Sequence, residues 1–140
     1  MNGPCIHRGW SSTILALIAP AVFAQDRAGS LTSDQLHTLF HGSSWAVEFG
    51  GASNFMPVWD FNADGTLCGR LRGAKAGTKC ADIGKWRLQG DLICWDFTWL
   101  GEIDNYKSIC ARAHKQDKRT YMLIDQSGKF PPVPFHSLAQ

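Results

Sequence analysis

Two cysteines, Cys94 and Cys110, constrain the fold more than any other feature of this sequence. From Asp91 to Trp99, apolar residues alternate with other residues, which is typical of a strand with one buried face. A second apolar run, 106–113, follows a turn-rich connector. A hairpin centred near Glu102 would bring both the cysteines and the apolar faces together, and a slip of one residue would separate both. The pairs expected from this register are Cys94–Cys110, Trp95–Ile109 and Ile93–Ala111.

The first 24 residues predict an export signal. Arg8 precedes a short apolar core, 14–23, and Ala24 supplies the small residue before a cleavage site. A membrane anchor is the alternative, but the apolar run is shorter than the roughly 20 residues that a span needs. We therefore expect a signal peptide at 1–24 and a single exported domain at 25–140, periplasmic or secreted, with no transmembrane segment after cleavage.

Cysteine usage agrees with export. The sequence has five cysteines, and Cys5 would be removed with the signal. Four cysteines in a small exported domain indicate two disulfides, for which three pairings exist. We expect Cys94–Cys110 and Cys68–Cys80, because each pair is symmetric about a turn. Zinc is the alternative, but the closely spaced cysteines of a structural zinc site are missing.

The remaining patterns predict an all-β domain. A short helix near 31–41 begins with Thr32, which Gln35 complements in a capping box. Seven segments show strand patterns: 45–49, 55–61, 66–72, 79–88, 91–99, 106–113 and 119–125. Together they predict a small antiparallel meander or barrel of about seven strands with one short N-terminal helix; a two-sheet sandwich is the alternative. Pro57 predicts an edge strand or a bulge, and the proline-rich tail 130–135 is expected outside the sheet.

Three tryptophans are the candidates for ligand contact: Trp99, Trp59 and Trp45. Trp99 lies at the end of its strand beside Gly101, where a barrel would open, and its ring would have one wet edge. Trp95, in the middle of the same strand, is expected in the core. Core packing is the more frequent use of inward tryptophans and is the alternative for the whole row.

Catalytic and metal-binding patterns are weak. The stretch Asp60–Leu67 resembles the start of a calcium loop, but Leu71 stands where the bidentate glutamate belongs, so a strand turn is the better interpretation. His37 and His41 make half a metal site. Several carboxylates lie on turns or outward faces, and no pattern shows which of them meet. We assign no catalytic residue, metal or cofactor.

Five further motifs carry a resemblance to a known family: Leu31-Thr-Ser-Asp-Gln-Leu, Trp59-Asp-Phe-Asn-Ala-Asp-Gly-Thr-Leu, Gly84-Lys-Trp-Arg-Leu, Asp91-Leu-Ile-Cys-Trp and the later Cys110. In their order the chain resembles small exported proteobacterial proteins classed as a domain of unknown function. The resemblance implies a lone domain behind a signal peptide, with Cys94 and Cys110 as the recurring pair. A weaker likeness to lipocalin-type barrels rests on Gly84-x-Trp86.

Without residues 1–24, which include Arg8 as their one charged residue, 13 Lys and Arg face 12 Asp and Glu, a net charge of +1. This near-zero charge argues against nucleic acid or an anionic membrane as the main partner. Our leading hypothesis is a non-enzymatic binding protein of the cell envelope, whose ligand is a small apolar molecule or a glycan. A protein-interaction module, for instance an inhibitor of a secreted hydrolase, is the second hypothesis. An enzyme is the third, and it would need polar groups that converge in a pocket.

Overall fold

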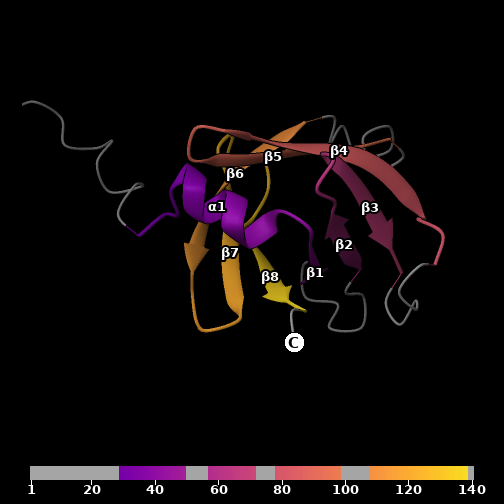
Figure 1. Ribbon diagram of the computed structural model, residues 1–140. Coiled ribbons are helices and arrows are strands. Elements are labelled where there is room, and N and C mark those ends of the chain that lie inside the picture. The colour runs from indigo at the N-terminus through magenta and orange to yellow at the C-terminus, as the bar shows by residue number, and fades with distance from the viewer. Residues whose placement is uncertain (1–28, 50–56, 72–77, 99–107, 139–140) are drawn as a thin grey trace, which may run out of the picture.

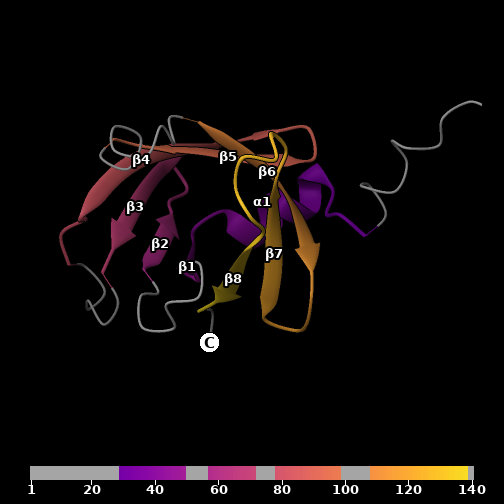
Figure 2. The same ribbon diagram turned by 180° about the vertical axis from the view of Figure 1, so that it is seen from behind.

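The computed structural model describes residues 29–49, 57–71, 78–98 and 108–138. The predicted signal and Trp99 lie outside them. One helix precedes eight strands, which form a closed barrel in which each strand pairs with the next and β8 pairs with β1, all antiparallel (Figures 1 and 2). The elements are α1 (Ser33–Phe40), β1 (Ser43–Val47), β2 (Val58–Phe61), β3 (Thr66–Arg70), β4 (Asp82–Gln89), β5 (Leu92–Phe97), β6 (Ile109–Lys115), β7 (Thr120–Asp125) and β8 (Val133–Ser137).

The hairpin of β5 and β6 has the predicted register. Cys94 pairs with Cys110, Trp95 with Ile109 and Ile93 with Ala111. Both predicted disulfides, Cys94–Cys110 and Cys68–Cys80, are present. The all-β prediction with one short helix is confirmed, and the architecture is the barrel rather than the sandwich.

Two predictions about prolines are wrong. The tail forms β8, which closes the barrel between β7 and β1. Pro134 is tolerated because it lies opposite Glu48, just beyond the end of β1. Its carbonyl accepts a hydrogen bond from the Glu48 N–H at 3.0 Å, so the proline costs only the one bond that a backbone N–H at this position would donate. Pro57 does not mark an edge, because a closed barrel has none; it directly precedes β2, and its carbonyl accepts from the Val47 N–H.

Aromatic rings fill the interior of the barrel. Alternate residues of each strand point inward, and Trp45, Phe61, Trp95 and Phe135 are all at most 6 % exposed. Phe135 has its ring centroid 5.4 Å from that of Trp59 and 6.1 Å from that of Trp95. An interior of eight strands is just wide enough for side chains to fill. The inward faces predicted for β1, β2 and β5 are confirmed where the structure describes them.

Helix α1 covers the end of the barrel where the β4–β5 turn lies. The predicted capping box is present: the Thr32 hydroxyl accepts from the Gln35 N–H, and the Gln35 side chain accepts from the Thr32 N–H at 2.9 Å. The Ser33 N–H donates to Asp91 in that turn at 3.1 Å. Because Leu36 and Phe40 are fully buried, the helix seals this end with apolar side chains.

Gly84 allows β4 to approach β5 closely. A Cβ atom at this position would lie 1.7 Å from the Asp96 carbonyl oxygen, which is backbone and cannot rotate away. Gly69, on the neighbouring strand, offers a contrast, because its nearest neighbour would be a side-chain atom of Phe97 at 3.2 Å. A glycine is therefore required at 84 by the path of the backbone.

The first prediction concerns the disulfides. The protein purified without reductant should contain no free thiol among Cys68, Cys80, Cys94 and Cys110. Thiol titration of the denatured, unreduced protein measures this, and peptide mapping should recover the Cys94–Cys110 and Cys68–Cys80 peptides. A peptide that links Cys68 to Cys94 would contradict the strand register.

The second prediction concerns Gly84. Gly84→Ala should destabilise the protein by about 3 kcal/mol or more, at the upper end of overpacking costs, because the backbone of β5 must move. Gly69→Ala is the matched control and should cost less, since the Phe97 ring can adjust. Denaturant unfolding of the two variants measures the difference. Equal stability of the variants would show that the close approach at Gly84 has no energetic weight.

Candidate functional site

The three tryptophans predicted to contact a ligand occupy different positions. Trp99 lies outside the described residues. Trp45 and Trp59 face each other across β1 and β2 and are 1 % and 4 % exposed. The Trp59 ring packs 4.8 Å from Phe97, and the Trp45 ring packs 4.9 Å from Phe40. Either ring would meet a ligand only inside the barrel, where aromatic neighbours surround it, so their role in binding stays a prediction.

A groove on the outer wall offers more accessible chemistry. It has a volume of about 370 Å³ and is open to solvent. Its walls come from the turn before β3 and from β3, β4 and β5. The lining residues are Asp64, Gly65, Thr66, Lys85, Trp86, Arg87 and Asp96. Four of these side chains carry charge, two of each sign.

Strand register brings these groups together. Thr66 pairs with Lys85, and Lys85 pairs with Asp96, so the three form a row across β3, β4 and β5. Lys85 and Arg87 are two residues apart on the same outward face of β4. The Trp86 N–H donates to the Gly65 carbonyl at 2.9 Å, which continues the β3–β4 contact into the turn that carries Asp64. The groove is thus built by strand pairing and a tight turn.

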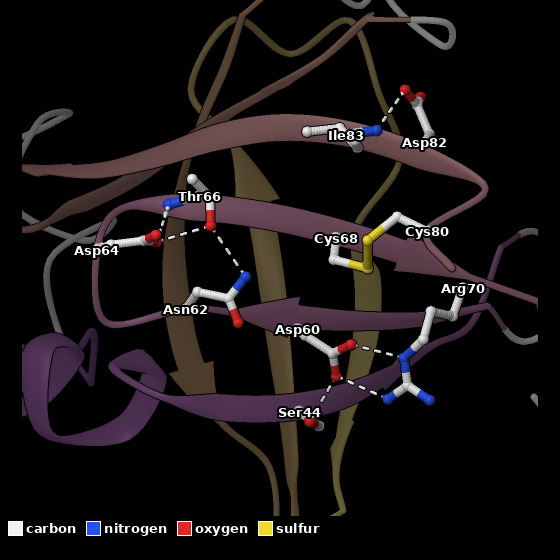
Figure 3. Close-up of a disulfide and its surroundings, with 10 residues drawn as sticks. All are labelled: Ser44, Asp60, Asn62, Asp64, Thr66, Cys68, Arg70, Cys80, Asp82 and Ile83. Carbon is white, nitrogen blue, oxygen red and sulfur yellow. Dashed lines mark hydrogen bonds and ion pairs between the residues drawn. A yellow bond between two sulfur atoms is a disulfide. The ribbon is translucent and has the colours of Figure 1, made fainter. Parts of the chain in front are cut away.

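Asp64 is held by hydrogen bonds within its own turn. One carboxylate oxygen accepts from the Thr66 hydroxyl at 2.6 Å and from the Thr66 N–H at 2.9 Å (Figure 3). Asn62 donates to the same hydroxyl at 2.9 Å, and the Trp86 indole donates to the Asn62 carbonyl at 2.8 Å. These bonds from Thr66 lower the pKa of Asp64, so the carboxylate is ionised at neutral pH.

The charges of the groove are not paired with one another. Within the described part of the chain, neither Lys85 nor Arg87 forms an ion pair. Asp96 accepts a hydrogen bond at 3.1 Å from the backbone N–H of Lys85, not from its ammonium group. Two cations and two carboxylates therefore share one groove, where the described chain occupies one oxygen of each carboxylate and leaves the other available to a ligand.

Asp60 and Arg70 show the opposite arrangement on the adjacent wall. Two nitrogens of the Arg70 guanidinium donate to the two oxygens of Asp60 at 2.6 and 2.8 Å, and the Ser44 hydroxyl donates to Asp60 at 2.6 Å (Figure 3). Partial burial raises the pKa of Asp60, but the bonds from Arg70 and Ser44 and the charge of Arg70 outweigh it, and the pKa lies below its usual value. Both carboxylates of the calcium-like stretch thus have protein partners.

A third polar set lies on β7, β8 and the end of β1. The His136 ring contacts the Glu48 carboxylate at 3.1 Å through Nε2 and the Thr120 hydroxyl at 3.2 Å through Nδ1. For the Thr120 hydroxyl to act as a nucleophile beside His136, nearby backbone N–H groups would also have to donate to the oxyanion that forms in the reaction. The Thr120 N–H is already bonded to Asp117 at 2.8 Å. We therefore interpret these three side chains as a link across the closing strands.

Comparison with known proteins gives no further guide to the site. No family model, curated protein or solved structure matches the chain. Among the described residues, no helix is both long and apolar enough to pass through a membrane. The same residues contain no cluster of three or more His, Cys, Asp or Glu side chains able to hold a metal ion.

Sequence patterns predicted the positions of some groove residues but not that they lie together. The alternation of 79–88 places Lys85 and Arg87 on the outward face, and Asp64 and Asp96 fall on a turn and an outward face. The missing step was the register between β3, β4 and β5, which alone brings these four together. Their chemistry was visible in the sequence, whereas their proximity was not.

The third prediction concerns Asp60. Its pKa is lowered in the folded state, so the ionised form stabilises the fold above the usual pKa of 3.8, and this stabilisation is lost as the pH falls through the lower folded value. Asp60→Asn should cost about 1–2 kcal/mol at neutral pH. The cost should shrink below about pH 3.8 as the native aspartate becomes protonated.

Denaturant unfolding at neutral and acid pH measures this difference. Asp34→Asn, which removes an exposed carboxylate of α1, is the control and should change stability by about 0.5 kcal/mol or less. A cost for Asp60→Asn that does not vary with pH would show that shape, not charge, matters at this position.

Proposed function

We propose that this protein is an exported, periplasmic or secreted binding protein of the cell envelope that holds a glycan in the groove between Asp64 and Asp96. The observation that carries the proposal is the groove itself, where carboxylate, ammonium, guanidinium and hydroxyl groups converge on about 370 Å³ of open space. These groups match the hydroxyls of a sugar, since carboxylates accept from them and cations donate to them.

Packing favours the glycan over a small apolar ligand. The core residues of the described chain include rings from α1, β1, β2, β4, β5, β7 and β8, and none of the buried side chains in that part is polar. An apolar ligand inside the barrel would have to displace these rings. A polar ligand on the outer wall displaces only water.

The Asp64 carboxylate is suited to binding a sugar rather than to acid catalysis. A glycosidase uses one protonated carboxyl group as its general acid. Asp64 is ionised at neutral pH because the Thr66 hydroxyl and N–H stabilise its charged form. This carboxylate would therefore accept hydrogen bonds from a sugar and would not donate a proton to one.

Export rests on three supports: the predicted signal at 1–24, the cysteine usage and the two disulfides. Disulfides persist in oxidising compartments such as the periplasm and the extracellular space. The periplasm or the cell exterior is also where a glycan of the envelope would be met. Location and ligand class thus support each other.

The fourth prediction tests glycan binding. Purified exported protein should bind a soluble oligosaccharide from a panel of envelope glycans, measured by titration calorimetry. The double variant Lys85→Gln, Asp96→Asn should weaken binding at least tenfold, because each charge-assisted hydrogen bond contributes about 1.5–3 kcal/mol.

The variant Lys115→Gln is the matched control, since Lys115 is exposed on β6 outside the groove, and it should bind like the native protein. Melting temperatures of both variants check the fold. Failure of the native protein to bind any glycan of the panel would overturn the proposal.

A second candidate function is a protein-interaction module, such as an inhibitor of a secreted hydrolase. It is favoured by two apolar side chains, Leu71 and Ile83, each 59 % exposed on the wall near the Cys68–Cys80 disulfide. Ile83 lies directly opposite Cys68. Inhibition of secreted glycosidases by the native protein, lost in Ile83→Ser, would support this function.

A further inference from the structure

The arrangement of charges in the groove points to the class of glycan. Lys85 and Arg87 lie along β4, with their Cα atoms roughly 7 Å apart. Asp96 lies on β5, directly opposite Lys85, and Asp64 lies in the turn that leads into β3, where it lines the same groove as Arg87. A positive stripe on the central strand is thus flanked by a carboxylate on each side.

This pattern discriminates among ligands by their charge. A ligand of one sign is attracted by half of the groove and repelled by the other half at distances of roughly 5 Å between strands, so the two effects largely cancel. A ligand that carries both signs can set each charge against its opposite. Repulsion of singly charged ligands adds to the selectivity.

The residues are also suited to separate roles. The guanidinium of Arg87 is planar and can donate two parallel hydrogen bonds to one carboxylate. Asp96 lies diagonally across from Arg87, and its bond to the Lys85 N–H occupies only one of its oxygens. The other oxygen is available to an ammonium group. Arg87 and Asp96 therefore match the two ends of a ligand that spans the groove.

We propose that the groove selects a zwitterionic glycan, one that carries both carboxylate and ammonium groups, with the carboxylate on Arg87 and the ammonium on Asp96. This inference rests on the proposed function and narrows it. Peptide-bearing cell-wall glycans have this chemistry, and neutral storage or structural glycans do not.

The fifth prediction uses four soluble probes: the trimer of N-acetylglucosamine, which is neutral; the trimer of glucosamine, which carries ammonium groups; the trimer of galacturonate, which carries carboxylates; and a muramyl-peptide fragment with a free amine and free carboxylates. Calorimetry on the native protein should give the fragment an affinity at least about tenfold above that of the neutral trimer. Added salt should reduce this preference, because it screens exposed charges.

Two single variants separate the two roles. Arg87→Gln should abolish the preference for the fragment and create a preference for the glucosamine trimer over the neutral one, because the carboxylates of the groove then outnumber its cations. Asp96→Asn, which retains the acceptor for the Lys85 N–H, should also abolish the preference for the fragment, but it should favour the galacturonate trimer instead. Lys115→Gln should leave the preference for the fragment unchanged. Melting temperatures check that each variant is folded, and Asp96→Ser, which also removes the charge at this position, replaces Asp96→Asn if the latter is not.

The outcomes are distinct. Equal affinity for the neutral trimer and for the fragment would overturn the zwitterion inference while leaving the proposed function intact. A preference for the fragment that survives both variants would place the selecting charges elsewhere and would also overturn it. No binding of any probe, or of any glycan in the wider panel, would overturn both proposals.

Discussion

The packing of aromatic rings inside the barrel is the interaction on which the rest of the structure depends. Phe135 lies within 6.4 Å, centroid to centroid, of rings from α1, β2 and β5, so one residue of the closing strand joins three parts of the fold. Its contacts with Phe40 and Trp59 are edge-to-face, a geometry that adds to the stabilisation that burial alone provides. Because the interior is occupied by rings, the groove that gathers polar and charged side chains lies on the outer wall.

The outer wall uses the same residue types for two purposes. Asp60 and Arg70 are paired, partly shielded and bonded to Ser44, which is the form that ionic groups take when they hold strands together. Asp64 lies in the turn before β3 and Arg87 lies on β4; both are exposed to water, and they form no ion pair with each other within the described residues. A shielded charge needs a partner, because a buried charge without one would cost desolvation free energy. An exposed charge needs no protein partner, because water solvates it.

Much of this fold follows from the sequence, and the failures have physical causes. Period-two alternation with two cysteines on one face determined the β5–β6 register, because only one alignment satisfies both. Thr32 and Gln35 identified the helix start through a local hydrogen-bond pattern. The eighth strand was missed because Pro134 suggested that the tail could not pair, and the cost of a proline depends on which ladder bond it removes. The groove was missed because its residues are brought together by pairing between strands, which local patterns do not encode.

Closure of the barrel by β1 and β8 has a consequence for the order of events in folding. Trp45 on β1 pairs with Ser137 on β8, so the contacts that close the barrel join residues more than 90 positions apart in the sequence. The two cysteines of the β5–β6 disulfide are only 16 positions apart. Local hairpins form quickly, whereas pairing between distant segments is slow because a long loop must first be closed. A chain that emerges from its N-terminus completes its central hairpins before β8 appears. Until β8 pairs with β1 and β7, the aromatic interior stays open, and this exposed apolar surface is prone to aggregation.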